Sequence, residues 1–344
     1  MTLNYIGHNN WDGQNFINFY NNVISKRWDR IILFCQNEYD WHSHNETYFP
    51  LLLEHCIRTN QVIDVIAGSH SDQYPTIPNI ITDNTRVVYW GTNWLGKTYH
   101  SLIRVGTAKS INPYQTTDYK YHFISMNSNP HQHRQYLVDL LAKYDLLRFN
   151  AVSMHQQNLN VYTWKYFKFE PLILEPEFPS DKQQHRVPDQ YYNSFAQLVS
   201  ESADDTIFLS EKTATPLILG KPFVVATQKN FHKYLKELGF QLYDEIFDYS
   251  FDNITDREER FEALLQNFIR LQKIPLGELS KLRVIVADKI EYNKRRAKEI
   301  IYDPNYYPTL AQEIIDCYLK TGVSIDQKLI SDYQFLQEVR NLPL

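Results

Sequence analysis

The chain has 344 residues, of which 43% are hydrophobic and 15% aromatic, and its formal net charge at pH 7 is −5. This length suits two α/β domains of roughly 100–200 residues each. The negative net charge excludes a generally basic surface that would attract nucleic acid or anionic membrane, but it does not exclude a local basic cleft. Because we see no run of about 18 apolar residues and no secretory signal in MTLNYIGHNNWDG, we expect a cytoplasmic protein without a membrane span.

Short apolar runs alternate with amphipathic stretches through the first hundred residues. The runs predict strands at 3–7, 30–36, 62–68 and 86–91, and the stretches predict helices at 14–25 and 47–59. This rhythm favours a doubly wound parallel sheet. The polar segment 106–120 breaks the rhythm and is the predicted linker. We therefore expect an N-terminal Rossmann-like domain over 1–115.

The second half of the chain repeats the alternation. A strand is predicted at 121–127 and a strongly periodic helix at 132–146, followed by an irregular Pro-rich passage at 171–188. Further predicted elements are helix 191–201, strand 206–210, helix 213–219, strand 222–226 and helices 230–238, 256–271, 276–300 and 309–320. We expect a C-terminal Rossmann-like domain over 116–300, with helices of 301–344 packing back on the N-terminal domain. Two such domains facing across a cleft would bind a ligand outside the carboxyl ends of both sheets.

An acid and a base stand side by side in Ser210-Glu211-Lys212, at a predicted strand-to-helix turn. A helix N-terminus attracts phosphate oxygens, Lys212 adds a mobile positive charge, and the Glu211 carboxylate can accept both hydroxyl protons of a ribose. The alternative is a capping device, in which Ser210 caps the helix and Glu211 stabilises its first turn.

A second loop of the same form follows the strand predicted at 121–127. The loop NSNPHQH ends on Arg134 at the start of a helix, where a guanidinium can bind a phosphate through two hydrogen bonds. Two such loops, each carrying a cation and each ending on a helix, would converge on a pyrophosphate.

These two segments resemble a known family. SEKTATPLILGKPFVV (210–225) resembles the donor-binding signature of the α1,3-fucosyltransferase-like glycosyltransferases, and NSNPHQHR (127–134) resembles that family's Asn-Pro loop ending in Arg. Both also look like phage, algal-virus and marine bacterial glycosyltransferases, in which a Gly-Lys-Pro-Phe run precedes a helix ending in Leu-Gly-Phe, as in KYLKELGF (233–240). The resemblance covers about 120–255 and hardly touches the N-terminal half.

The resemblance implies a glycosyltransferase of the GT-B fold, with a UDP- or GDP-linked sugar bound by the C-terminal domain. Glu211 would hold the ribose hydroxyls, while Lys212 and Arg134 would neutralise the leaving diphosphate. Phe208 stands where that family has Tyr, so its ring could stack on a base without supplying a hydroxyl. The implied donor-binding set is Asn129, Arg134, Phe208, Ser210, Glu211, Lys212 and Thr213.

The acceptor side belongs to the N-terminal half. An inverting transfer needs a carboxylate or a His near the acceptor hydroxyl, and the loops after the first two predicted strands carry Asp12, Glu38 and Asp40, with His8 behind them. Taken alone, a residue of this kind in a loop is more commonly a turn or capping residue. A retaining mechanism would need no such base.

Metal and acceptor are the remaining questions. The pairs His42/His44 and His131/His133 lack a third ligand at suitable spacing, so we expect neither a metal nor a cofactor beside the nucleotide sugar. The acceptor would be a glycan or, alternatively, a hydroxymethylated base in phage DNA. If the protein is viral, we expect it in the host cytoplasm. A cluster of basic residues is the reason to retain DNA as an alternative acceptor, although such a cluster is commonly a solvated helix face. The cluster comprises Lys281, Arg283, Lys289, Lys294, Arg295, Arg296 and Lys298. A non-catalytic nucleotide- or sugar-binding module is the second alternative.

Overall fold

The computed structural model describes residues 2–7, 13–28, 30–35, 48–67, 85–89, 93–104, 118–174, 187–205 and 207–302. The chain divides into two compact units, of which the first is mainly Met1–Asn93 and the second mainly Trp94–Asp204 and Ser210–Tyr302. The division falls between Asn93 and Trp94, in the first turn of helix α5 (Asn93–Arg104), which the sequence patterns did not predict. The predicted linker 106–120 lies largely outside the described residues.

The first unit contains a parallel four-stranded sheet in the order β1-β2-β3-β4. Its strands are β1 (Thr2–Gly7), β2 (Arg30–Cys35), β3 (Val62–Ala67) and β4 (Thr85–Tyr89), and its helices are α1 (Gly13–Ser25) and α3 (Tyr48–Thr59). All six elements were predicted. The expected double winding is absent from these strands, because they follow one another in chain order and α1 packs against α3. Successive crossovers of the usual right hand in one direction place their helices on one face of a sheet in this way.

The second unit contains a parallel sheet in the order β6-β5-β7-β8. Its strands are β5 (Tyr121–Asn127), β6 (Ala151–Met154), β7 (Ser194–Ser200) and β8 (Phe223–Ala226). The chain steps from β5 to β6, returns past β5 to β7 and then continues to β8. The direction of winding therefore reverses between β5 and β7, and the carboxyl ends of these two strands form a topological switch point.

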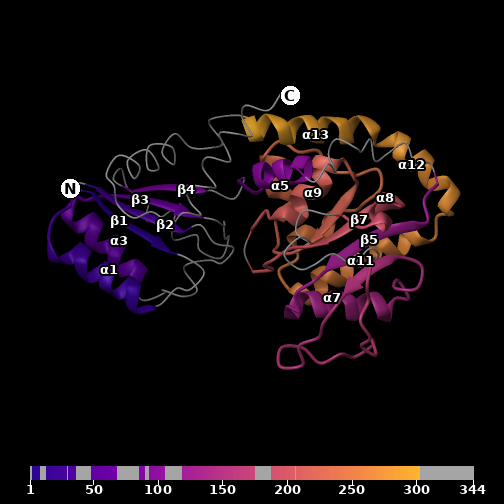
Figure 1. The fold of residues 1–344 in the computed structure, drawn as a ribbon, viewed down its shortest axis with the longest axis horizontal. Helices are drawn as coiled ribbons and strands as arrows, with labels where there is room; N and C mark the ends of the chain where they lie inside the picture. The colour runs from indigo at the N-terminus through magenta and orange to yellow at the C-terminus, as the bar shows by residue number, and fades with distance from the viewer. Residues whose placement is uncertain are drawn as a thin grey trace. The chain divides into compact units, whose positions relative to one another are not determined.

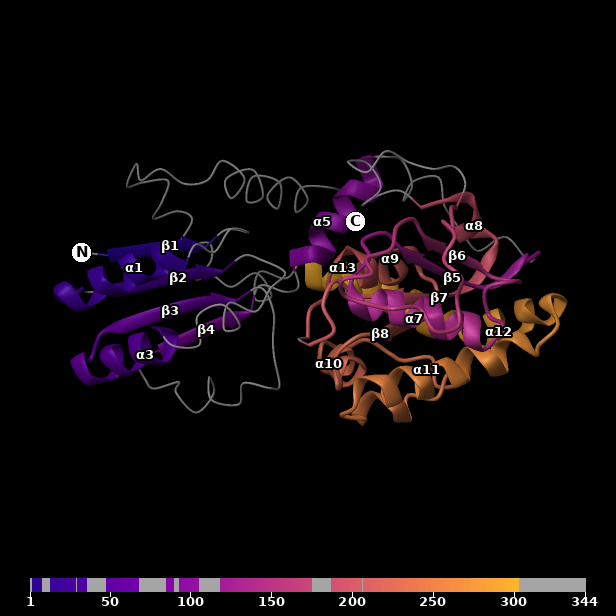
Figure 2. The same cartoon turned by 90° about the horizontal axis from the view of Figure 1, so that it is seen from below.

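Helices cover both faces of this sheet. Helices α7 (Gln132–Lys143) and α11 (Arg257–Gln272) lie on one face, and α9 (Glu211–Leu219) and α13 (Ala287–Tyr302) on the other (Figures 1 and 2). The remaining elements are α8 (Asp189–Tyr192), α10 (Phe231–Glu237), α12 (Leu279–Ile285) and the 3-10 helices η2 (Ser250–Asn253) and η3 (Leu276–Glu278). This three-layer arrangement directs the N-termini of α7 and α9 to the switch point from opposite faces.

Two of the predicted elements were wrong. The predicted helix 191–201 is mainly strand β7, whose seven residues are all buried; a central parallel strand covered on both faces has no polar alternation to distinguish it from a buried helix. Residues 207–210, predicted as part of a strand, belong instead to the connection between β7 and α9. The long helix predicted at 276–300 is interrupted at Val286 between α12 and α13. The stretch 309–320 lies outside the described residues.

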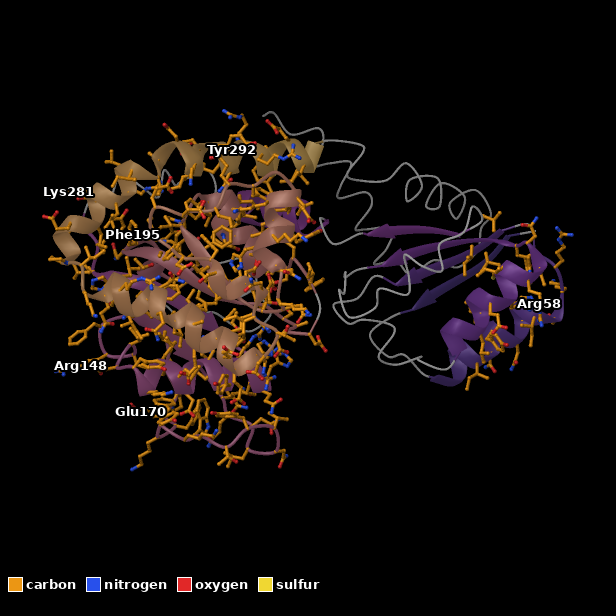
Figure 3. The ribbon with its side chains drawn as sticks, turned by 180° about the vertical axis from the view of Figure 1, so that it is seen from behind. Arg58, Arg148, Glu170, Phe195, Lys281 and Tyr292 are labelled. Atoms are coloured by element: carbon orange, nitrogen blue, oxygen red, sulfur yellow. The ribbon has the colours of Figure 1, made fainter. Side chains whose placement is uncertain are left out.

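The segment that follows β6 is fastened to α7 by two polar side chains one helical turn apart. Asp139 is fully buried, and its carboxylate accepts hydrogen bonds from the Tyr162 hydroxyl at 2.6 Å and from the backbone N–H groups of 165–167 at 2.6–2.8 Å. Gln135 donates to the carbonyl oxygen of Asn158 at 3.1 Å and accepts from its N–H at 2.8 Å. Figure 3 labels Glu170 near the end of this segment. The chain beyond β6 is thereby held beside the start of α7.

Replacing Asp139 by Asn should cost about 2–3 kcal/mol of unfolding free energy, because an amide cannot accept all four of these hydrogen bonds and would leave buried N–H groups unpaired. Urea denaturation measures the change. Asp244→Asn is the matched control, since its side chain is 58% exposed and lies 3.7 Å from Lys289, and it should change stability by less than about 0.5 kcal/mol. Equal effects of the two substitutions would contradict the role given to Asp139.

Candidate functional site

Two connections meet at the switch point of the second sheet. The first runs from Asn127, the last residue of β5, to α7, and the second runs from Ser200, the last residue of β7, to α9. Because β5 and β7 are paired and parallel, both connections emerge at the same sheet edge. Their polar residues form the switch-point cluster, which comprises His131, His133, Arg134, Glu201, Ser202, Asp204, Ser210, Glu211, Lys212 and Thr213.

The centre of this cluster is Glu201, which has no exposed surface. Its Oε1 accepts hydrogen bonds from the N–H groups of Ser210 (3.1 Å) and Thr213 (3.3 Å) and from the Thr213 hydroxyl (2.5 Å). Its Oε2 accepts from the N–H of Ser202 at 3.1 Å and from the Ser210 hydroxyl. The carboxylate thus joins both ends of the connection 201–210 and sets the position at which α9 begins. Glu201 was not among the residues predicted from the sequence; the signal that could have identified it is an acid directly after a buried apolar run.

Ser210 is the N-cap of α9. Its backbone is extended, with φ −96° and ψ −175°, and its Oγ accepts from the N–H of Lys212 at 3.2 Å. The capping alternative therefore holds for Ser210. Ser210 and Thr213 are both buried and bound to Glu201, so these two predicted donor-binding residues position the turn rather than face a ligand.

Glu211 and Lys212 are joined to each other. Lys212 Nζ donates to Glu211 Oε1 at 2.5 Å and to Ser202 Oγ at 2.9 Å. Glu211 is 8% exposed, and its Oε2 makes no hydrogen bond within the described part of the chain. Burial alone would raise the pKa of Glu211, but the charge and hydrogen bond of Lys212 outweigh it and hold this pKa below its ordinary value. The site therefore contains an ionised carboxylate, one oxygen of which is buried and makes no hydrogen bond in the described structure.

Arg134 is close enough to this pair for its charge to lower the pKa of Glu211. The residue is 2% exposed, and its Nη2 donates to the backbone carbonyl of Glu201 at 2.9 Å. Its Nη1 lies 3.5 Å from the carbonyl oxygen of Asn129, a residue whose side chain is exposed. Because the guanidinium is covered and holds the Glu201 backbone, it supplies a fixed positive charge at the site rather than the open two-bond phosphate contact predicted from the sequence.

His133 is enclosed on the same side. Its Nε2 lies 2.9 Å from the Glu201 carbonyl, and its Nδ1 lies 3.4 Å from Asp204, which also pairs with Arg257 at 3.0 Å. Burial lowers the pKa of His133 to about 4 against the opposing effect of Asp204, so the ring is neutral at pH 7. With Nε2 on a carbonyl and Nδ1 facing Asp204, His133 cannot ligate a metal in this arrangement. Across the described ranges, no three His, Cys, Asp or Glu side chains are grouped to hold one.

The other predicted site residues have different outcomes. Phe208 is 1% exposed, so its ring offers no open face on which a base could stack. Asp12, Glu38 and Asp40 lie outside the described residues, as do His8 and the pair His42/His44.

Five of the seven cations in the basic cluster between Lys281 and Lys298 pair with carboxylates. The pairs are Lys281–Glu278 (2.5 Å), Lys289–Glu245 (2.9 Å), Lys294–Glu291 (3.1 Å), Arg295–Glu299 (3.8 Å) and Arg296–Glu299 (3.2 Å). Arg283 donates to the carbonyl of Gly220 at 3.3 Å. Figure 3 labels Lys281 on α12 and Tyr292 on α13, the two helices that carry this cluster. These pairings are typical of a solvated helix face, and they weaken the argument for a DNA acceptor.

Comparisons with protein-family models, curated proteins and solved structures gave no match to this chain. None of the helices in the described ranges is long and apolar enough to cross a membrane.

The role of Glu201 predicts a large effect of removing its charge. Glu201→Gln keeps the side-chain shape but directs an amide N–H₂ at N–H and hydroxyl donors, so we expect a loss of about 3–5 kcal/mol of unfolding free energy. Chemical denaturation measures this loss. Glu262→Gln is the control, because Glu262 binds Lys143 at 2.6 Å with a side chain that is 37% exposed, and it should cost less than about 1 kcal/mol. A Glu201→Gln protein as stable as this control would refute the assignment.

Proposed function

We propose that the protein is a glycosyltransferase that moves a sugar from a nucleotide-sugar donor to a hydroxyl acceptor, and that the donor binds at the switch-point cluster. The observation that carries the proposal is the Glu211 carboxylate, ionised and nearly buried, with one oxygen on Lys212 and the other without a hydrogen bond in the described structure. It stands at the N-terminus of α9, where a doubly wound sheet binds ligands.

Each group of the donor has a counterpart in this arrangement. The ribose diol would donate its two hydroxyl protons to the Glu211 carboxylate. Lys212, released from Glu211 as the diol takes its place, would bind the diphosphate, and the N-terminus of α9 would add its partial positive charge. Arg134, which is 2% exposed, would contribute a fixed charge, and preorganised charge is most effective where water is excluded.

The chemistry that follows is displacement at the anomeric carbon. The bond between this carbon and the diphosphate oxygen breaks, the leaving oxygen keeps the electron pair, and the acceptor oxygen forms the new glycosidic bond. The positive charge of Lys212 and Arg134 would stabilise the nucleoside diphosphate as its negative charge grows. In an inverting reaction a carboxylate takes the acceptor proton, and this is the role proposed for Asp12, Glu38 or Asp40.

The proposal also includes the type of donor and the type of acceptor. The resemblance over 120–255 supports a GT-B enzyme with a UDP- or GDP-linked donor, in which the first unit would bind the acceptor. The ion pairs along α12 and α13 favour a glycan over a modified base in DNA, because five of the seven cations there already pair with carboxylates, which leaves fewer to meet a phosphate backbone.

Calorimetry on two single variants tests the donor site. Lys212→Ala should weaken binding of the nucleoside diphosphate at least tenfold and leave the free nucleoside unchanged, because Lys212 meets only phosphate. Glu211→Ala should weaken both ligands by about 1–3 kcal/mol for the lost charged hydrogen bonds. The matched control is the exposed pair Lys143 and Glu262, whose Ala variants should bind both ligands as wild type does.

Two results would count against this proposal, the first against the site and the second against the enzyme. If Lys212→Ala binds the diphosphate normally while Glu211→Ala only melts earlier, the pair is a helix start and the donor site lies elsewhere. If nucleotide sugars bind but none in a panel of UDP- and GDP-linked donors is slowly hydrolysed or transferred, the protein is a binding module rather than an enzyme.

The acceptor side is tested by Asp12→Ala, Glu38→Ala and Asp40→Ala. For an inverting reaction, one of these should lower kcat by about 10²–10⁴-fold, the usual contribution of a general base, and leave donor affinity unchanged. Steady-state kinetics and calorimetry separate the two effects. Normal turnover by all three variants would exclude these residues as the base.

A further inference from the structure

His131 lies at the switch point and has no part in the roles given above. It is the N-cap residue of α7, and its backbone carbonyl accepts from the N–H groups of Arg134 (3.1 Å) and Gln135 (3.0 Å). Its half-buried ring stacks on His133 with ring centroids 5.8 Å apart and an angle of 7° between the planes. Within the described residues, neither ring nitrogen makes a hydrogen bond. An imidazole with two available nitrogens thus stands at a helix N-terminus beside the proposed diphosphate site.

The charges that face this ring come from three elements. Arg134 lies on α7, Lys212 on α9 and Asp204 on the connection between β7 and α9, and the neutral ring of His133 lies alongside. Asp204 is already engaged, since Arg257 binds it at 3.0 Å and His133 lies 3.4 Å away. Burial, and then Arg134 and Lys212, lower the pKa of His131 against the opposing effect of Asp204. The ring is therefore neutral at pH 7 in the ligand-free protein.

We propose that His131 is a further ligand of the diphosphate and that it takes up a proton from solvent when the diphosphate binds. The protonated ring would donate an N–H to a phosphate oxygen beside Lys212. This inference deepens the proposed function, but it requires only the diphosphate group and neither the nucleoside nor the sugar. His133 cannot play this part, because its Nε2 is held on the Glu201 carbonyl and its ring is enclosed.

The coupling follows from charge balance. The two cations near His131 oppose its protonation in the free protein, and a multiply charged anion placed between these groups reverses the local potential. The pKa of His131 is then higher in the complex than in the free protein. Diphosphate affinity is consequently greatest below the free pKa, falls as the pH rises between the free and bound values, and levels off above the bound value. A rise of one pKa unit corresponds to about a tenfold change in affinity.

The experiment uses the full chain and inorganic pyrophosphate. Histidine imidazole signals are followed by NMR against pH with and without pyrophosphate, and the His131→Asn protein assigns the signal of His131. We expect pyrophosphate to raise the pKa of His131 by at least one unit. We also expect His131→Asn to weaken pyrophosphate binding several-fold more at pH 6 than at pH 8.5, because pH 6 lies nearer to the pH range in which His131 is protonated. Taking the ratio of variant to wild type at each pH removes the titration of pyrophosphate itself.

His55 of α3 is the matched control, because burial and Arg58 lower its pKa in a similar way. Neither its pKa nor pyrophosphate affinity in His55→Asn should change. The proposal is overturned if pyrophosphate does not bind, if it binds without moving the pKa of His131, or if His131→Asn weakens binding equally at both pH values. A raised pKa in a protein that neither binds nor turns over any nucleotide sugar would support this proposal and reject the glycosyltransferase.

Discussion

The buried carboxylate of Glu201 is the constraint on which the switch-point cluster depends. A charge removed from water is tolerated only where donors replace its hydration, and here the donors come from residues 202–213 of the same connection. Satisfying the carboxylate therefore closes the connection and fixes the first turn of α9. The backbone carbonyl of Glu201 is held as well, because Arg134 and His133 both donate to it. One residue thus joins the two loops that flank the switch point.

This arrangement separates fixed groups from adjustable ones. Arg134, Glu201 and His133 are enclosed, and changing their partners would leave buried polar groups unpaired. Lys212 and His131 are partly exposed and lie at the surface of the same cluster, so a ligand can reorganise them without disturbing the fold. An arrangement of enclosed, preorganised charges beside partly exposed groups that can change partners is suited to binding a highly charged molecule from water.

Much of the fold could be predicted from sequence, because in the first unit apolar runs and amphipathic stretches differ clearly in period. The start of α9 at Ser210-Glu211-Lys212 was also predictable, since a hydroxyl followed by an acid is a local capping signal. Strand β7 was not, because its complete burial removes the alternation that identifies a strand. The burial of Arg134 could not be predicted either, because its partner is the backbone of a residue 67 positions further along the chain. The role of Glu201 could not be predicted for both reasons, because Glu201 directly follows β7 and its backbone carbonyl is the partner of Arg134.

The adjacency of Glu211 and Lys212 then has a physical explanation that includes both the capping and the ligand hypotheses. A nearly buried carboxylate at the first position of α9 would be costly without a counter-charge, and Lys212 supplies one at 2.5 Å while staying partly exposed. A pair of this kind is stable only while each member lacks a better partner. A ligand that offers hydroxyl donors to Glu211 and negative charge to Lys212 replaces both halves of the interaction at once, whereas a ligand with only one of these groups would leave the other residue uncompensated. In the proposed site this pair would therefore favour molecules that carry a diol and a phosphate together over free phosphate, because only such molecules compensate both residues.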